Sequence, residues 1–207
     1  MRAVVDLQEF PVNAHRIVRS WYEWQTATLR SEGRDIGQVR IPGATREYQY
    51  WLANPPRTSD GGLLLDIGGL NWSAEPSGEG WVLTKDERGL PSTVGKLRRF
   101  ADVEKYILCL MGAGPYSREY RTSAPGTRWY REGVHPRVRL EKTDPTREYS
   151  TTRLYVDDET QDRGFLCGEI DAVRFSHPLV MNYEQVESIY KAGLPQEWFS
   201  LELEIIE

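Results

Sequence analysis

The alternation of apolar and polar positions is clearest at residues 100–111, where it predicts an amphipathic helix. The apolar side chains that recur there every three or four residues are Phe100, Val103, Ile107, Leu110 and Met111. That spacing places them on one helical face, whereas Asp102, Glu104 and Lys105 fall off this face. Glycine and proline at positions 112, 114 and 115 end the pattern. We therefore expect this helix to be the central element of the core.

Two further helices are predicted, one near each end of the chain. Residues 12–30 carry Ile17, Trp21 and Trp24 at helical spacing. We expect these tryptophans to pack inward, and the alternative is an aromatic recognition patch. Near the C-terminus, Asn182 is suited to cap a short helix over residues 183–191.

The rest of the pattern predicts short strands. Alternating residues at 47–52 indicate a half-buried strand, and further strand signals are at residues 63–67, 81–84, 138–142, 152–156, 165–175 and 198–206. The Gly168-Glu169 pair interrupts the run at 165–175, which suggests a bulge or tight turn. The expected fold class is α+β, a twisted and mostly antiparallel sheet with the central helix and two further helices. Residues 1–207 read as a single domain, in which an N-terminal part (1–90) and a C-terminal part (91–207) share one core.

Composition and charge narrow the classes of partner. The 207 residues carry a formal net charge of -5, which argues against nucleic acid or an anionic membrane as a general partner. No apolar run has the length of a membrane span and the N-terminus lacks a secretory signal, so we expect a cytoplasmic protein. Cys109 and Cys167 lie in apolar settings and are expected to be buried thiols rather than a redox pair.

Candidate catalytic and metal-binding chemistry is sparse. His15, His135 and His177 are far apart in sequence, and no pair has the spacing of a zinc site, so neither a metal nor another cofactor is expected. Ser176 and His177 would point to opposite faces of a strand, which argues against an acyl-transfer pair with Asp171. We therefore expect a protein-binding module rather than an enzyme.

Two segments are candidates for contact with a protein partner. Residues 112–136 read as an irregular loop in which basic and aromatic residues interleave, among them Tyr116, Arg118 and Trp129. A solvated loop whose arginines pair with local carboxylates is the plainer interpretation of that loop. The second candidate is an acidic hairpin tip formed by Asp157, Asp158 and Glu159. A calcium site is not expected at this tip, because the EF-hand spacing is missing.

Several short motifs from Trp81 onward resemble a known family. They lie at residues 81–84, 87–89, 99–100, 102–106, 110–112, 118 and 172–177. This pattern resembles the immunity-protein family that includes the immunity factor for tuberculosis necrotizing toxin, and it covers about half of the chain. The resemblance implies a cytoplasmic antitoxin of an actinobacterial cell that sterically blocks a secreted toxin, in the best-known case an NAD glycohydrolase. Within that hypothesis, Asp157, Asp158 and Glu159 would mimic the anionic groups of the substrate.

An alternative function remains open at this point. A small-molecule-binding protein or hydrolase would have a pocket between the sheet and the central helix, with His177 and either Asp171 or Glu169 at its mouth. A structural or chaperone-like interaction protein without a toxin partner is a third possibility.

Overall fold

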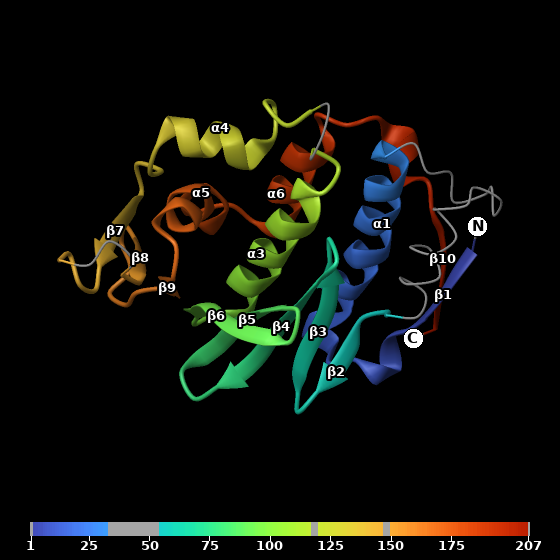
Figure 1. Ribbon diagram of the computed structural model, residues 1–207, viewed down its shortest axis with the longest axis horizontal. Helices are drawn as coiled ribbons and strands as arrows, with labels where there is room; N and C mark the ends of the chain where they lie inside the picture. Colours follow the sequence, from blue (N-terminus) through green and yellow to red (C-terminus); the bar gives the residue numbers. More distant parts are fainter. Residues whose placement is uncertain (1, 33–53, 117–119, 147–149, 207) are drawn as a thin grey trace.

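The computed structural model describes residues 2–32, 54–116, 120–146 and 150–206 and has an α+β fold (Figure 1). Its larger sheet has eight antiparallel strands in the order β2-β3-β4-β5-β6-β9-β8-β7. These strands are β2 (Arg57–Ser59), β3 (Gly62–Ile67), β4 (Leu70–Ser77), β5 (Gly80–Glu87), β6 (Leu90–Leu97), β7 (Val138–Lys142), β8 (Thr152–Val156) and β9 (Gly164–Leu166). The predicted α+β class and antiparallel sheet are confirmed.

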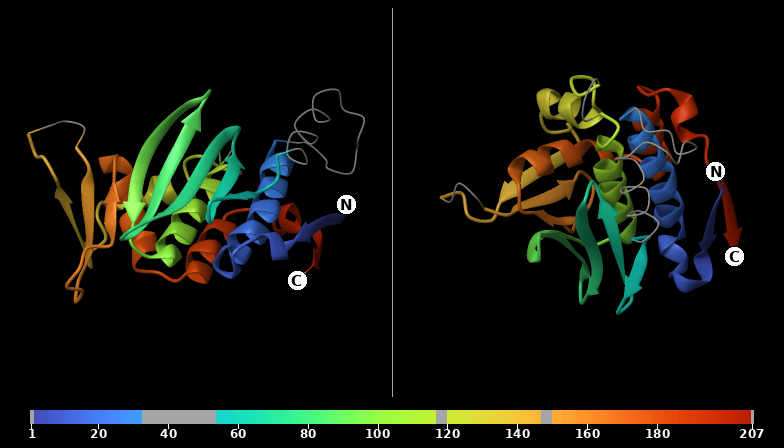
Figure 2. Two further views of the ribbon diagram at one scale, coloured as in Figure 1. Left: turned by 90° about the horizontal axis from the view of Figure 1, so that it is seen from below. Right: turned by 45° about the vertical axis from the view of Figure 1, so that its right-hand side comes forward.

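Helices gather on one face of the large sheet (Figure 2). The described residues contain five α-helices, namely α1 (His15–Ser31), α3 (Phe100–Ala113), α4 (Pro125–Glu132), α5 (Glu169–Leu179) and α6 (Tyr183–Lys191). Three 3₁₀ helices are short: η1 (Leu7–Glu9), η2 (Val12–Ala14) and η3 (Gln196–Phe199). No helix within the described ranges is long and apolar enough to cross a membrane.

The predicted central helix is α3, and its apolar face lies in the core. Val103, Ile107 and Met111 are buried, while Phe100 and Leu110 are partly buried. Helices α1, α5 and α6 pack around α3 and the sheet lies beneath it, so little of its surface reaches solvent. Because α3 is enclosed in this way, Asp102, Glu104 and Lys105 are buried as well. These three residues therefore belong to the interior, although the pattern placed them off the apolar face.

The N-terminal helix confirms the prediction of core tryptophans. Trp21 and Trp24 on α1 are fully enclosed, and the Trp21 indole nitrogen donates a hydrogen bond to the Asp66 carbonyl oxygen. These contacts support core packing over an aromatic patch. The α-helix begins later than predicted, since residues 12–14 form η2 and Val12 is 83% exposed.

The strand meander between residues 57 and 97 is more extensive than predicted. Strands β3 and β5 contain the predicted segments 63–67 and 81–84, and β4 and β6 lie beside them as additional strands. On the covered face, Leu63 pairs with Ala74, and Ala74 pairs with Leu83. The strand predicted at residues 47–52 lies outside the described residues.

The C-terminal third departs from the predicted strands in two places. The apolar run at 165–175 leaves strand β9 after Leu166 and becomes helix α5 at Glu169. Its buried residues Ala172, Phe175 and Leu179 recur every three or four positions, and acidic residues occupy the first helical turn. The helical period thus outweighs the strand propensity of this run, and the expected bulge is a helix start.

The predicted final strand is also shorter than expected. Trp198 belongs to η3, and only β10 (Glu202–Ile206) is a strand. It pairs in parallel with β1 (Arg2–Asp6) in a separate two-stranded sheet, so it does not extend the large sheet. The predicted helix at 183–191 is confirmed as α6, with a capping box formed by Asn182 and Gln185.

Candidate functional site

The acidic segment predicted as a partner contact is the turn that joins β8 to β9, which we call the acidic turn (residues 157–163). Its backbone is fixed by hydrogen bonds from Asp157 N to Arg137 O and from Arg163 N to Leu154 O. Asp158 has a left-handed backbone with φ 68°, a conformation that asparagine and aspartate tolerate better than most residues. Both ends of the turn are therefore held by backbone hydrogen bonds to residues outside it.

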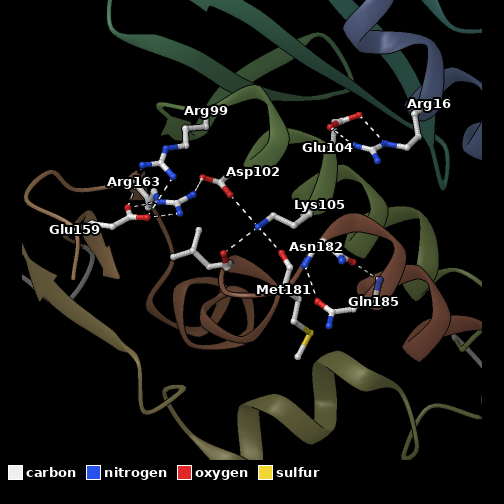
Figure 3. A network of polar contacts seen from close by, with 11 residues as sticks. Arg16, Arg99, Asp102, Glu104, Lys105, Glu159, Arg163, Met181, Asn182 and Gln185 are labelled. Atoms are coloured by element: carbon white, nitrogen blue, oxygen red, sulfur yellow. Dashed lines mark hydrogen bonds and ion pairs between the residues drawn. The ribbon is translucent and has the colours of Figure 1, made fainter. Parts of the chain in front are cut away.

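Behind the acidic turn lies a chain of alternating charges that reaches into the core (Figure 3). The Arg163 guanidinium bonds the Glu159 carboxylate, with Nη2 to Oε1 at 2.6 Å, and the Asp102 carboxylate, with Nη1 to Oδ2 at 2.8 Å. The second Asp102 oxygen, Oδ1, is 3.0 Å from Lys105 Nζ. Arg99 pairs with Glu159 at the outer end of the chain. We call these five residues the buried ion-pair chain.

The inner end of the chain is Lys105, whose ammonium group has three oxygen atoms close to it. Lys105 Nζ donates to the carbonyl oxygens of Leu179 at 2.9 Å and Met181 at 3.0 Å, in addition to its ion pair with Asp102. Two of these contacts are hydrogen bonds, and the third is a charge contact whose geometry does not meet that of a hydrogen bond. Leu179 is the last residue of α5, where a cation is favoured by the helix dipole. The chain thereby ties α3 to the end of α5.

A second group of charges fixes the other end of the acidic turn. Arg98 binds Asp162 through Nε and Nη2, each at 3.1 Å, and Arg153 Nη1 is 3.2 Å from the same carboxylate. Burial is the largest single influence on Asp162 and acts to raise its pKa, but the combined effects of Arg98, the Gly164 backbone N–H and Arg153 lower the pKa overall. The hydrogen bond from Arg163 lowers the pKa of Glu159. Both carboxylates are therefore stabilised in their charged forms.

The three acidic residues of the predicted contact have different roles. Asp157 and Asp158 are exposed, and their side chains form no ion pair with any described residue. Glu159 is partly buried and is already paired with Arg163 and Arg99. The acidic cluster predicted from sequence is thus divided into two outward carboxylates and one structural carboxylate. Sequence could not reveal this, because Arg99 lies 60 residues away from Glu159.

The other predicted contact residues lie in the core where they are described. The Tyr116 ring is buried and its hydroxyl donates to the Tyr190 carbonyl oxygen at 2.6 Å. Trp129 is buried on α4 and stacks on His177 with ring centroids 5.8 Å apart. Arg118 lies outside the described residues. Residues 125–132 of the predicted irregular loop form helix α4, and Trp129 is on its buried side. The rings of Tyr116 and Trp129 are therefore both in the interior and not on the surface.

The structure brings together two histidines that sequence spacing had separated. The His135 and His177 rings are 5.3 Å apart, and His177 Nε2 is 2.9 Å from the Gly133 carbonyl oxygen. Ser176 Oγ accepts from His135 N and donates to Val173 O, so it is engaged with the backbone. No group of three or more metal-ligating side chains was found in the described part of the chain. His177 lies on α5, whereas the pattern predicts a strand at residues 165–175, so the approach of the two rings is not expected from the sequence.

The two cysteines are free thiols in partly buried positions. Burial raises the pKa of Cys109 to about 12 and also raises the pKa of Cys167. Both groups are therefore protonated at neutral pH, which makes them poor nucleophiles.

Comparisons with known proteins give one structural likeness. No protein-family profile and no curated protein matches this sequence. Among solved structures, Rv3902c from M. tuberculosis superimposes with a TM-score of 0.51 at 17% sequence identity. The alignment covers 79% of this chain and 93% of that chain. At this level of identity the likeness concerns the fold alone.

Proposed function

We propose that this protein is an immunity protein that binds a cognate secreted toxin and sterically blocks its substrate cleft. The main support for the proposal is that residues of the immunity-like motifs contact one another in the structure. Arg99, Asp102 and Lys105 belong to these motifs and form three of the five members of the buried ion-pair chain. Because residues from separate motifs are joined by ion pairs, the motifs support the family resemblance.

Aromatic contacts link the remaining motifs to the same framework. Trp81 on β5 packs against Phe100 with ring centroids 4.6 Å apart, and Tyr106 on α3 packs against Phe175 on α5 at 5.3 Å. All four residues belong to the immunity-like motifs.

The acidic turn is the contact surface that we assign to the toxin. It presents Asp157 and Asp158 to solvent, while Glu159, Asp162 and Arg163 anchor it from behind. A contact that is ordered before binding loses less conformational entropy on association. A cleft that binds a dinucleotide commonly presents positive charge to the phosphates, so two exposed carboxylates are complementary to it.

The candidate nucleophiles also support a binding role over a hydrolytic one. Ser176 Oγ is engaged with two backbone groups, and Cys109 is held as a neutral thiol by burial. The hydrogen bonds of Ser176 Oγ therefore go to the backbone of His135 and Val173, and none of them joins it to His177, its neighbour in sequence. This local chemistry fits a structural role for these residues.

The test uses a purified NAD glycohydrolase toxin domain of the kind that the family resemblance implies, and measures its NAD⁺ hydrolysis with and without this protein. We expect equimolar wild-type protein to abolish the activity. The double variant Asp157→Lys/Asp158→Lys should need at least about tenfold more protein for half inhibition, because like charges then oppose association. Glu159 is left unchanged, since its loss would disturb the fold.

Asp60→Lys is the matched control for this experiment. Asp60 is an exposed aspartate in another turn and has a left-handed backbone with φ 49°, like Asp158. We expect it to inhibit like wild type. Absence of inhibition by the wild-type protein would refute the function, whereas equal inhibition by the double variant and the control would refute only the choice of surface.

A further inference from the structure

A cavity of about 200 Å³ lies among helices α3, α4, α5 and α6. This cavity differs from the predicted pocket between the sheet and the central helix, because helices form its walls. Its floor and sides include Leu110, Phe175 and the rings of Tyr106 and Trp129. Such a lining favours an apolar ligand smaller than the drug-sized molecules for which larger pockets are typical.

The space exists because α4 presents small residues to its neighbours. Ala124 and Gly126 line the cavity from this side. A Cβ atom added at Gly126 would lie 3.7 Å from Tyr190 Oη, which is an ordinary van der Waals distance. A larger side chain at this position would therefore enter the cavity without a backbone clash.

The interior polar groups are uncharged. Burial raises the pKa of Cys109 to about 12 and also raises the pKa values of Tyr106 and Tyr190. These groups offer hydrogen bonds to a ligand and no ionic partner. Any charged part of a ligand must therefore lie at the rim.

Two exposed charges of opposite sign stand at that rim. Asp171 and Arg174 are one turn apart on α5, and both line the cavity. No ion pair joins them among the described residues, and the Arg174 guanidinium lies 5.6 Å from the centre of the Tyr130 ring. Partial burial raises the pKa of Asp171, while the positive charges of Arg174 and Lys85 act to lower it.

We propose that this cavity binds a small apolar or aromatic α-amino acid, with its side chain among the helices and its zwitterionic head group at the rim. Asp171 accepts hydrogen bonds from the ammonium group, and Arg174 donates to the carboxylate. The proposal does not depend on toxin binding, because it uses different elements of the fold.

The test is an NMR titration of the full-length protein with L-phenylalanine. Phenethylamine lacks the carboxylate, 3-phenylpropionate lacks the ammonium group and glycine lacks the apolar body. We expect L-phenylalanine to shift the signals of cavity residues and to bind at least about tenfold more tightly than each of the three. No shifts at these residues up to about 10 mM ligand, or equal binding of a comparison compound, would overturn the proposal.

Variants of the cavity complete the experiment. Gly126→Leu fills the space, and Asp171→Asn and Arg174→Gln each remove one head-group partner, so each should weaken L-phenylalanine binding by about tenfold. Glu169→Gln is the control on the same helix, because its carboxylate pairs with Lys142 and does not line the cavity. If Gly126→Leu does not fold, the two rim variants decide. Rim variants that bind like the control would contradict the assignment.

Discussion

The stability of the buried ion-pair chain depends on Asp102, because this residue pairs with two of its cations. Its carboxylate is 0% exposed and lies between the cations of Lys105 and Arg163. A buried charge is costly unless it is paired, because the protein interior solvates it poorly. Each cation in turn depends on Asp102 for part of its compensation. The residue therefore stabilises two elements through a single side chain.

We predict that Asp102→Asn lowers the free energy of unfolding by about 3–5 kcal/mol. The amide keeps the size of the side chain but removes the negative charge between the two buried cations. Urea denaturation followed by circular dichroism measures the change. Glu141→Gln is the control, because it breaks the exposed Arg139–Glu141 pair and should cost less than about 1 kcal/mol. Equal costs for the two variants would show that the buried chain contributes little.

Among the secondary-structure elements, a helix could be predicted from sequence when it had both a regular spacing of apolar residues and clear residues that end or cap it. The predictions of α3 and α6 are confirmed, since each has a regular period and a clear terminus. Helix α4 was missed because its eight residues are mostly polar and it lies in a segment rich in arginine. Helix α5 was missed because Val173 and Phe175 favour a strand locally, and only packing against the sheet selects the helix.

Two glycines of α4 allow the effect of backbone strain on stability to be compared with that of helix propensity. Gly133 has φ 83° and ψ -160°, a region that is essentially restricted to glycine. Gly133→Ala should therefore lower the free energy of unfolding by about 1–3 kcal/mol. Gly126→Ala, in the first turn of the same helix, should be neutral or stabilising by up to about 1 kcal/mol. Thermal unfolding of both variants measures the difference, and the reverse order would contradict the described end of α4.

For the whole molecule, local sequence predicted which residues are charged but not which charges are already paired. Asp157 and Asp158 were identified from their own clustering, and they are indeed exposed. The pairing of Glu159 with Arg99 and the approach of His135 to His177 depend on residues that are distant in sequence. Tyr116 and Trp129 were candidates for the surface and instead pack around Tyr190. A single sequence contains no direct signal for such contacts, because they arise only when the elements assemble.

The central claim is that this protein occupies the substrate cleft of a toxin. Titration calorimetry of the protein into an NAD glycohydrolase toxin domain of the kind that the resemblance implies tests this claim most directly, with and without a saturating, non-hydrolysable NAD⁺ analogue. We predict an equimolar complex whose apparent affinity falls by at least about tenfold when the analogue fills the cleft. Absence of binding, or an affinity that the analogue leaves unchanged, would contradict the account.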